Sequence, residues 1–461
     1  MSYFCGIGVC QACVTPDGQR SCLEPAFVEP LHFEPELIVV GAGPAGLSAA
    51  LAAAEAGVRV AVVDRGKHPG GQYLRQGQIS ARSPELVRRV AAHPSIHLLL
   101  GHEVWQAQPD RTLDLAGVDG SGVRSLRPDA VVLAPGAYDR VVPFPGWELP
   151  GVVTVGGAQA LLKGQGHKVG PRVLVAGTGP LLLSLAVSLA SAGVKVVGVA
   201  DPVRLTAWLP HLSTVVRAPR KVLQATAYRT RLAALGVPIW GEGLESVTRE
   251  GERLIARLAS RTVTVDAVAV GHGFTPQTEL AAAMGCTLAT DPRDGSTIVD
   301  GCPDGVYAAG ELTGVGGADA AIATGTLAGL AAAHRLGKLD DRAHARAARR
   351  WLKRAAAAAR FATALHAVHT TPVSFADETV LCRCEGVTFG TARAAMALGA
   401  DDPRSLKLLT RVGMGPCQGR LCGASAAALL GCPPDAYSHR PVAVPVPLTA
   451  FLRADLPPEE S

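Results

Sequence analysis

The sequence contains little charge and no concentrated basic region. Charged residues make up 18% of its 461 residues, and the net charge at pH 7 is only +5. Proteins that bind nucleic acid usually carry a dense patch of Lys and Arg, so this composition argues against DNA or RNA as a partner. A chain of this length also exceeds what one hydrophobic core usually serves, and we expect several domains of roughly 50 to 200 residues.

The sequence also lacks a recognisable export signal and an unbroken membrane-spanning segment. Its first residues carry neither the basic region nor the apolar core of a signal peptide, so the expected location is cytoplasmic. The uncharged segment Val173–Val194 meets the criterion of roughly 20 residues for crossing a bilayer. Gly177, Gly179 and Pro180 interrupt it, however, and indicate a strand, a turn and a helix. We therefore expect no transmembrane helix.

A glycine-rich turn follows the first strongly apolar segment. Residues 36–40 suit a short strand, residues 47–56 a helix, and residues 58–63 a second strand that ends in an acid. The first glycine of a GxGxxG turn bends the chain, the second lets the backbone approach a pyrophosphate, and the third lets the helix pack on the strand. The acid at the end of the second strand accepts hydrogen bonds from the ribose hydroxyls. The residues of this predicted dinucleotide site are Gly41, Gly43, Pro44, Ala45, Gly46 and Asp64.

Two later strands, residues 131–136 and 305–311, also end in glycine turns. With them the chain resembles the flavoproteins with two dinucleotide-binding domains, a family that includes thioredoxin reductase. The resemblance implies FAD at the first turn, with Gly136 nearby, and contact between the ribityl chain of the flavin and Gly310 and Glu311. The family usually has Asp in place of Glu311 and Thr in place of Pro135.

A second strand-turn-helix unit begins at residue 173. Gly177 and Gly179 occupy the first two glycine positions of its turn, and its next strand ends at Asp201. Leu182 replaces the third glycine, so we expect the helix to stand further from its strand and the phosphate contacts to change. Two alternatives remain open, namely NAD or another adenine nucleotide, and a structural domain without ligand. If NAD binds, Asp201 disfavours the 2′-phosphate of NADP.

No CxxC pair occurs between Asp64 and Gly310, where disulfide reductases of the resembled family carry their reactive cysteines. This absence argues against thioredoxin reductase activity. Cys286, Cys302 and Cys432 stand far apart in the sequence, and we interpret them as ordinary small residues.

The other eight cysteines form two clusters. The N-terminal cluster has the CxxxxCxxC spacing of a plant-type [2Fe-2S] site with a fourth cysteine further on; its ligands would be Cys5, Cys10, Cys13 and Cys22. Zinc or free thiols are the alternatives. About 30 residues cannot build a core unaided, so we expect a partial domain.

The C-terminal cluster combines a CxC and a CxxxxC sequence across a 32-residue gap that a helix at residues 391–398 would bridge. Its cysteines are Cys382, Cys384, Cys417 and Cys422. The pattern resembles the [2Fe-2S] domain of bacterioferritin-associated ferredoxin (BFD), and iron-sulfur is favoured over zinc.

Three further segments, residues 70–72 with Gly71 and Gln72, residues 136–147 and the tail around Cys417, resemble one narrower group. It comprises the flavoprotein subunits of opine oxidases, hydroxyproline dehydrogenases and hydrogen cyanide synthase. The resemblance covers nearly the whole chain and implies a partner, an oxidase-like flavoprotein that removes hydride from an amino acid or related amine.

The predicted fold class is therefore α/β, a flavoprotein with two dinucleotide-binding domains and a small BFD-like domain. The expected units are residues 1–33, a partial [2Fe-2S] segment; 34–150 and 273–340, the FAD domain; 151–272, an inserted NAD(P)-like domain; and 341–461, a helical linker with the BFD-like domain.

An FAD beside iron-sulfur clusters converts two-electron into one-electron transfer. The leading hypothesis, with the complex taken from the resemblance, is an electron-relaying subunit of an amino-acid, opine or hydroxyproline dehydrogenase or of a hydrogen cyanide synthase-type complex. A NAD(P)H-dependent reductase and a scaffold with degenerate sites are the alternatives. The sequence shows no side chain that we would name as a general base. His366 and His369 stand at helical spacing and are interpreted as solvated, with a shared ligand as the alternative. The basic run Arg342–Arg360 is interpreted as a solvated helix face, with an acidic partner or a peripheral membrane contact as alternatives.

Overall fold

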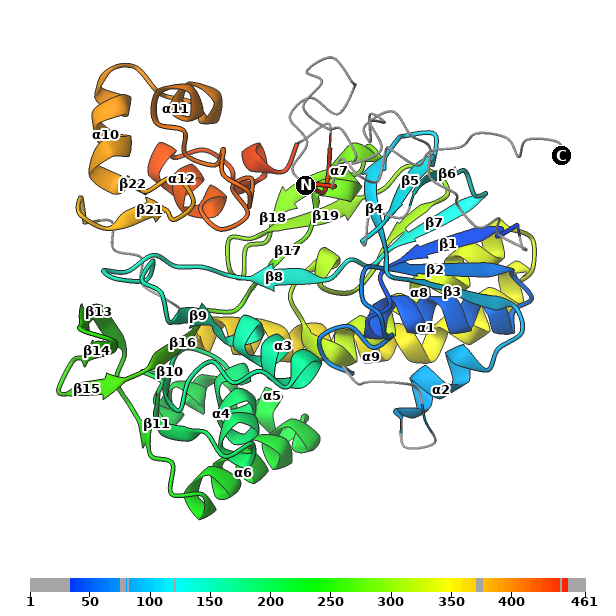
Figure 1. Cartoon of the computed structure of the whole chain (residues 1–461). Coiled ribbons are helices and arrows are strands. Elements are labelled where there is room, and N and C mark those ends of the chain that lie inside the picture. The colour runs from blue at the N-terminus through cyan, green and yellow to red at the C-terminus, as the bar shows by residue number, and fades with distance from the viewer. Residues whose placement is uncertain are drawn as a thin grey trace, which may run out of the picture.

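The computed structural model describes residues 34–74, 80, 83–118, 122–369, 376–439 and 442–446. Within them lie two parallel sheets, a ribbon that joins these sheets, and a small C-terminal domain (Figure 1). This arrangement confirms the predicted α/β fold class. No helix in the described ranges is both long and apolar enough to cross a membrane. The segment 173–194 instead folds as a strand, a turn and a helix.

The first sheet has the strand order β20-β7-β1-β2-β3, with every neighbouring pair parallel. Such a sheet is covered on both faces, so its strands are continuously apolar; all residues of β1 and β7 are buried. Its strands are β1 (Leu37–Val40), β2 (Val60–Asp64), β3 (Ile96–Leu100), β7 (Ala130–Leu133) and β20 (Val306–Ala308).

One face of the first sheet is covered by helices and the other by an antiparallel meander. The helices are α1 (Pro44–Glu55), α2 (Glu85–Ala91) and α8 (Gly317–Arg335), and the meander strands are β4 (His102–Ala107), β5 (Leu113–Gly117) and β6 (Val123–Leu126). Helices α1 and α8 lie very close together, because a Cβ at Gly325 or Gly329 would overlap backbone carbonyl groups of α1. The small residues of α8 therefore let this helix pack directly against the first turns of α1.

The second sheet has the strand order β12-β11-β10-β16-β9 and is also parallel. Its strands are β9 (Val152–Thr154), β10 (Arg172–Gly177), β11 (Lys195–Ala200), β12 (Ile239–Trp240) and β16 (Ala267–Gly271). The surrounding elements are α3 (Val155–Gln165), α4 (Leu181–Ser191), η1 (Leu205–His211), α5 (Leu212–Val216), α6 (Pro219–Ala234), β13 (Leu244–Glu250), β14 (Arg253–Leu258) and β15 (Thr262–Val265).

The two sheets are joined by an antiparallel pair, β8 (Ala137–Asp139) and β17 (Phe274–Pro276), which crosses between them in Figure 1. After β17 come α7 (Glu279–Ala283), the hairpin β18 (Thr287–Thr290) and β19 (Thr297–Gly301), and η2 (Gly310–Thr313). The chain thus leaves the first domain after β7, builds the second, and returns to complete the first.

The long helix α9 (Asp341–Val368) packs against α8 and leads to the C-terminal domain. Phe389, Leu406 and Cys422 lie in the hydrophobic core of that domain. This core is separate from the cores that cover the two sheets. The elements are β21 (Val380–Cys382), β22 (Val387–Thr388), α10 (Phe389–Ala397), α11 (Pro403–Thr410), α12 (Gly423–Leu430) and η3 (Pro434–Tyr437). Two helices, α10 and α11, therefore occupy the gap where the sequence predicts one.

Candidate functional site

The first glycine turn has the geometry of a phosphate cradle. Gly41 has a φ of +105°, and a Cβ there would overlap the carbonyl of Ala134. A Cβ at Gly46 would overlap the carbonyl oxygen of Gly41, whereas a Cβ at Gly43 would meet no protein atom within 4 Å. The first and third glycines are thus required by the fold, and the second leaves open space at the N-terminus of α1, where a pyrophosphate is stabilised.

Asp64 ends β2 beside this turn. Its Oδ2 accepts a hydrogen bond from the Ala42 N–H at 2.6 Å, and its Oδ1 accepts one from the Gly66 N–H at 2.7 Å. Each carboxylate oxygen retains further acceptor capacity, so the same group can hold the turn and receive ribose hydroxyls. That ribose contact stays a prediction.

The segment around Gly70 closes over the glycine turn. The Gly70 N–H donates to the Ala42 carbonyl at 2.8 Å. Gly71 has a φ of +57°, and a Cβ there would lie 2.8 Å from the Cα of Gly43. The structure thus brings Gly71 to the dinucleotide turn, and Gln72 is the next residue in the chain.

The turns at Gly136 and Gly310 lie at the carboxyl ends of neighbouring strands, β7 and β20. Gly310 has a φ of +73°, and a Cβ there would lie 2.8 Å from the Cβ of Ala45. Its N–H donates to Thr324 Oγ1 at 2.9 Å. In parallel sheets ligands bind at this edge, so the predicted residues of the first site converge on one rim of the sheet.

The carboxylate of Glu311 turns toward the first amides of α8. Oε1 accepts from the Gly317 N–H at 2.9 Å and Oε2 from the Gly316 N–H at 3.2 Å. Burial raises the pKa of this carboxyl, while the two N–H donors oppose that change. The side chain, longer than the Asp usual in the resembled family, thereby fixes the loop that starts α8.

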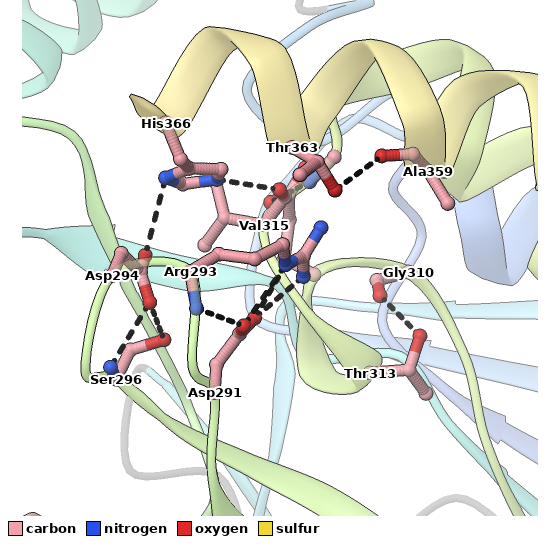
Figure 2. Close-up of polar contacts among 12 residues, drawn as sticks. Asp291, Arg293, Asp294, Ser296, Gly310, Thr313, Val315, Ala359, Thr363 and His366 are labelled. Atoms are coloured by element: carbon pink, nitrogen blue, oxygen red, sulfur yellow. Dashed lines mark hydrogen bonds and ion pairs between the residues drawn. The ribbon is translucent and has the colours of Figure 1, made fainter. Parts of the chain in front are cut away.

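A polar network lies next to this loop, at the tip of the β18–β19 hairpin (Figure 2). Asp291 and Arg293 form a bidentate ion pair in which Nε lies 2.9 Å from Oδ1. His366 of α9 donates from Nε2 to the Val315 carbonyl at 2.9 Å, and its Nδ1 lies 3.6 Å from Asp294 Oδ2. The network ties the hairpin tip to α9 and to the loop between Glu311 and α8.

The structure corrects the interpretation of two histidines as solvated. The His366 side chain is only 15% exposed. His369 packs edge-on against Trp208 with ring centroids 6.1 Å apart, and burial lowers its pKa to about 4. His366 lies in the last turn of α9 and His369 directly follows the helix. His366 faces the hairpin tip and His369 packs against η1, rather than solvent.

The second glycine turn keeps the first two features of the fingerprint. Gly177 has a φ of +125°, and a Cβ there would overlap the Gly271 carbonyl, whereas a Cβ at Gly179 would meet no protein atom within 4 Å. Leu182, at the third glycine position, is 1% exposed and packs against Gly271, whose missing side chain provides room. The glycine that accommodates the helix lies on the neighbouring strand, β16.

Asp201 follows β11, where an acid would receive the ribose of a nucleotide. Its Oδ1 accepts from the Val203 N–H at 3.1 Å. Burial raises the pKa of this carboxyl to about 6, against the opposing effects of that hydrogen bond and of Arg229.

Replacing Asp201 by Asn is expected to stabilise the domain without nucleotide at neutral pH. A carboxyl whose pKa is raised above 3.8 binds more protons in the native state between about pH 4 and 6, so the stability of the original protein falls as pH rises through this range and stays lower above it. Above this range the free energies of unfolding of Asp201→Asn and the original protein should differ by about 3 kcal/mol at most. Partial exposure of the carboxyl makes the difference smaller.

Thermal unfolding between about pH 4 and pH 8 measures this effect, with the exposed Asp300→Asn variant as the control. The stability of Asp201→Asn should exceed that of the original protein increasingly as pH rises, and level off above about pH 7. Parallel stability curves would contradict the assignment of a raised pKa to Asp201.

The four C-terminal cysteines lie together as two pairs. Cys384 Sγ lies 3.5 Å from Cys417 Sγ. Cys382 hydrogen-bonds Cys422, and both are 1% exposed. The Cys422 thiol and three backbone N–H groups, those of Gly413, Glu385 and Cys384, lower the pKa of Cys382 to about 6. Stabilised thiolates are the form in which cysteine binds iron or zinc.

The pairing of the four thiols suits an iron-sulfur cluster. Within the described ranges, no three or more His, Cys, Asp or Glu side chains are grouped so that they could hold a single metal ion. The [2Fe-2S] cluster takes two cysteines per iron, which two pairs supply. The residues present therefore fit a [2Fe-2S] cluster. The N-terminal cysteines Cys5, Cys10, Cys13 and Cys22 lie outside the described residues.

Arg420 connects the cysteine loop to the first domain. Its Nε donates to the Tyr138 hydroxyl at 2.9 Å and lies 3.0 Å from Glu279 Oε1, while Nη1 donates to the Cys417 carbonyl at 3.3 Å. The Arg420 and Glu279 side chains are each 11% exposed. Burial, with Glu279 as a further cause, raises the pKa of Tyr138 to about 12, so the phenol stays protonated and accepts from Arg420.

Two further contacts dock the C-terminal domain. Trp147 donates from its indole N–H to the Val380 carbonyl at 2.6 Å. Arg383, between two of the predicted cluster ligands, donates to the carbonyls of Leu149 and Val152 at 3.4 Å each. The domain that carries the cysteines is thus held against the segment that follows the Gly136 turn.

Comparison with known proteins agrees with this architecture. Residues 35–326 match the family described as "Pyridine nucleotide-disulphide oxidoreductase", and residues 380–431 match the "BFD-like [2Fe-2S] binding domain". The A subunit of opine oxidase from Agrobacterium tumefaciens (strain Ach5) is 34% identical, over 86% of this chain and 85% of that protein. The chain belongs to the family of the opine oxidase A subunits.

The chain is also similar to a hydrogen cyanide synthase subunit and, in its fold, to a solved dehydrogenase. Hydrogen cyanide synthase subunit HcnB of Pseudomonas protegens is 29% identical, over 84% of this chain and 89% of that protein. L-proline dehydrogenase from P. horikoshii shares the fold, with a TM-score of 0.60 and 18% identity over 87% of this chain and 74% of that chain. The chain is an FAD-dependent oxidoreductase with a BFD-like [2Fe-2S] domain, as predicted.

Sequence reasoning missed the residues that join the two cofactor domains of this member of the opine oxidase family. Arg420 lies between two predicted ligands, and Tyr138 lies two residues after Gly136. Their positions beside cofactor motifs were the only available signal, because 282 residues separate them in the chain. Glu279 carried no such signal at all.

Replacing Arg420 by Gln is expected to leave the cluster assembled but to slow electron transfer between FAD and cluster by at least about tenfold. The variant leaves Glu279 buried without its cation, which costs about 3 to 5 kcal/mol of domain docking. Anaerobic stopped-flow absorbance measures the rate, and the cluster's EPR spectrum reports its integrity.

Arg404→Gln, an exposed change in the same domain, is the matched control, and Arg420→Lys covers the case that the Gln variant misfolds. Because lysine restores the charge but not the fork of donors, it should transfer electrons at an intermediate rate. Unchanged transfer rates in both Arg420 variants would show that the contact does not position the cluster.

Proposed function

We propose that the chain is the electron-relaying subunit of a hetero-oligomeric complex that oxidises an amino acid, an opine or a related amine in the cytoplasm. The observation that carries the proposal is the bridge from the Cys417–Cys422 loop through Arg420 to Tyr138, just after the Gly136 turn. When bound, FAD supplies two-electron chemistry and a [2Fe-2S] cluster carries single electrons. The contacts of Arg420 hold the two binding domains together, and this fits electron transfer between FAD and the cluster.

The names of the relatives support a partner. The opine oxidase and hydrogen cyanide synthase relatives are both named as subunits. The proposed partner is an oxidase-like flavoprotein that takes hydride from the substrate and passes the electrons on. Within this chain, Glu311 and the glycine turns would hold FAD, Cys382, Cys384, Cys417 and Cys422 the C-terminal cluster, and Cys5, Cys10, Cys13 and Cys22 a second cluster.

The second candidate function is a NAD(P)H-dependent reductase that feeds the clusters. The open space at Gly179 and the acid at Asp201 favour a nucleotide at the second turn. The same site would serve an adenine nucleotide in a purely structural role, so its presence alone does not select this function.

Anaerobic reduction distinguishes the two functions. The chain is purified alone and together with a coexpressed oxidase-like flavoprotein, and the FAD absorbance is followed after addition of NADH, an opine or proline. The proposed function predicts bleaching only by the amine substrate and only in the presence of the partner. Prompt bleaching of the isolated chain by NADH would overturn it in favour of the reductase.

A further inference from the structure

Cys286 and Cys302 lie together although 16 positions separate them in the sequence. Cys286 directly precedes β18 and Cys302 directly follows β19, and their Sγ atoms are 2.9 Å apart across the base of this antiparallel hairpin. Cys286 is 6% exposed, and Cys302 is partly exposed. Both residues pack in or against the hydrophobic core as expected of small side chains, but the sequence did not predict that the hairpin makes them a facing pair of thiols.

The two thiols differ in a way that suits stepwise oxidation. The Cys286 thiol donates to Cys302 and the Ala308 N–H also donates to it, and both interactions lower the pKa of Cys302. The hydrogen bond that Cys286 donates to Cys302, together with burial, raises the pKa of Cys286. The partly exposed sulfur is thus the better nucleophile, and the buried one is held ready as the resolving thiol.

The hairpin that the pair closes supports the loop beside the predicted FAD site. Its tip carries Arg293, which lies against Gly314, and Asp294, which faces His366 of α9 (Figure 2). Gly314 lies between Glu311 and the first turn of α8. A covalent bond at the hairpin base would therefore restrict the segment that positions this loop.

We propose that Cys286 and Cys302 form a peroxide-oxidisable dithiol that closes into a disulfide across the base of the β18–β19 hairpin. Hydrogen peroxide oxidises the Cys302 thiolate to a sulfenic acid and leaves hydroxide. The Cys286 sulfur then attacks the Cys302 sulfur, the S–S bond forms, the S–O bond breaks, and water leaves with the thiol proton. Two thiols are oxidised, one peroxide is reduced, and the sulfurs need to approach by about 0.9 Å to reach disulfide length.

Tryptic mapping tests the proposal on the intact holoprotein. The only Lys or Arg between the two cysteines is Arg293, so trypsin places Cys286 in the peptide 262–293 and Cys302 in the peptide 294–335, each with a single cysteine. The anaerobic protein receives one equivalent of hydrogen peroxide, its remaining thiols are alkylated, and the digest is analysed without reductant.

The expected result is that these two peptides appear linked, and that dithiothreitol separates them. In Cys286→Ser the sulfenic acid at Cys302 should persist and react with dimedone. Two alkylated peptides after peroxide treatment, or Cys302 oxidised to sulfinic acid without linkage, would overturn the proposal. Cys432 is the control thiol outside the pair, and it should remain alkylated.

Hydrogen exchange measures the effect on the hairpin. In the oxidised protein the amides of residues 287–301 should exchange at least about tenfold more slowly than in the reduced protein, because local opening of the hairpin is restricted. The FAD content should be unchanged. Equal exchange in both forms would overturn the inferred restriction of the hairpin even if the disulfide forms.

Discussion

Replacing Cys384 by serine is expected to remove the C-terminal cluster and to end electron transfer to it, while FAD stays bound. Cys384 is exposed and pairs with Cys417 at 3.5 Å. Serine offers a hard, weakly acidic oxygen where iron-sulfur clusters require thiolate. Iron and acid-labile sulfide should fall by the two atoms of each that one cluster contains, and the flavin spectrum should be retained.

The matched control is Cys432→Ser in the same domain, which lies outside the two pairs and should keep its full iron and sulfide content. Because Cys384 is exposed, its replacement should not open the domain core, and circular dichroism checks this. If Cys384→Ser retained a complete cluster, the assignment of the two cysteine pairs as its ligands would be contradicted.

Replacing Gly43 by Ala is expected to weaken FAD binding by at least about 100-fold without unfolding the protein. A Cβ at Gly43 meets no protein atom within 4 Å, and its φ of −79° suits alanine. The added methyl therefore costs the protein itself little, but it occupies the space through which the backbone approaches a pyrophosphate. A 100-fold change corresponds to about 2.7 kcal/mol of binding free energy.

FAD titration of the apoprotein by fluorescence quenching measures the affinity. Gly241→Ala is a suitable control, since a Cβ there also meets no protein atom within 4 Å, and it should bind FAD normally. Gly46→Ala should behave differently from both, because its Cβ would overlap the Gly41 carbonyl and destabilise the domain itself. Normal FAD affinity in Gly43→Ala would show that the pyrophosphate lies elsewhere.

The parts of this molecule that follow from local pattern were predictable. A buried parallel strand is a short apolar run, and the turn at Gly41 must be glycine because the adjacent strand end at Ala134 leaves no room for a side chain. Those constraints act within one strand-turn-helix unit, so they are visible in the sequence. The CxC and CxxxxC spacings are similarly local.

Contacts between distant segments were not predictable. Arg420 meets Tyr138 and Glu279 only after three separate segments fold, and a single sequence contains no signal for that meeting. His366 and His369 have helical spacing, but the spacing does not say which face of α9 is covered. Cys286 and Cys302 face each other only because the hairpin register pairs Thr287 with Gly301.

The second glycine turn shows how a local rule is satisfied from outside its own motif. Leu182 breaks the GxGxxG pattern, and the sequence predicts a helix displaced from its strand. In the structure the room for Leu182 comes from Gly271 on the neighbouring strand. The GxGxxG pattern requires a small residue where the helix crosses the sheet. A glycine on the helix or a glycine on the neighbouring strand can meet that requirement.

The most direct test of the relay is to photoreduce FAD in the anaerobic holoprotein and to follow both cofactors, the flavin by absorbance and the C-terminal cluster by freeze-quench EPR. The Arg420 bridge predicts that the EPR signal of the reduced cluster grows as the reduced flavin is reoxidised, and that Arg420→Gln delays both changes equally. A flavin that stays reduced beside an oxidised cluster, when dithionite can still reduce that cluster, would contradict the account.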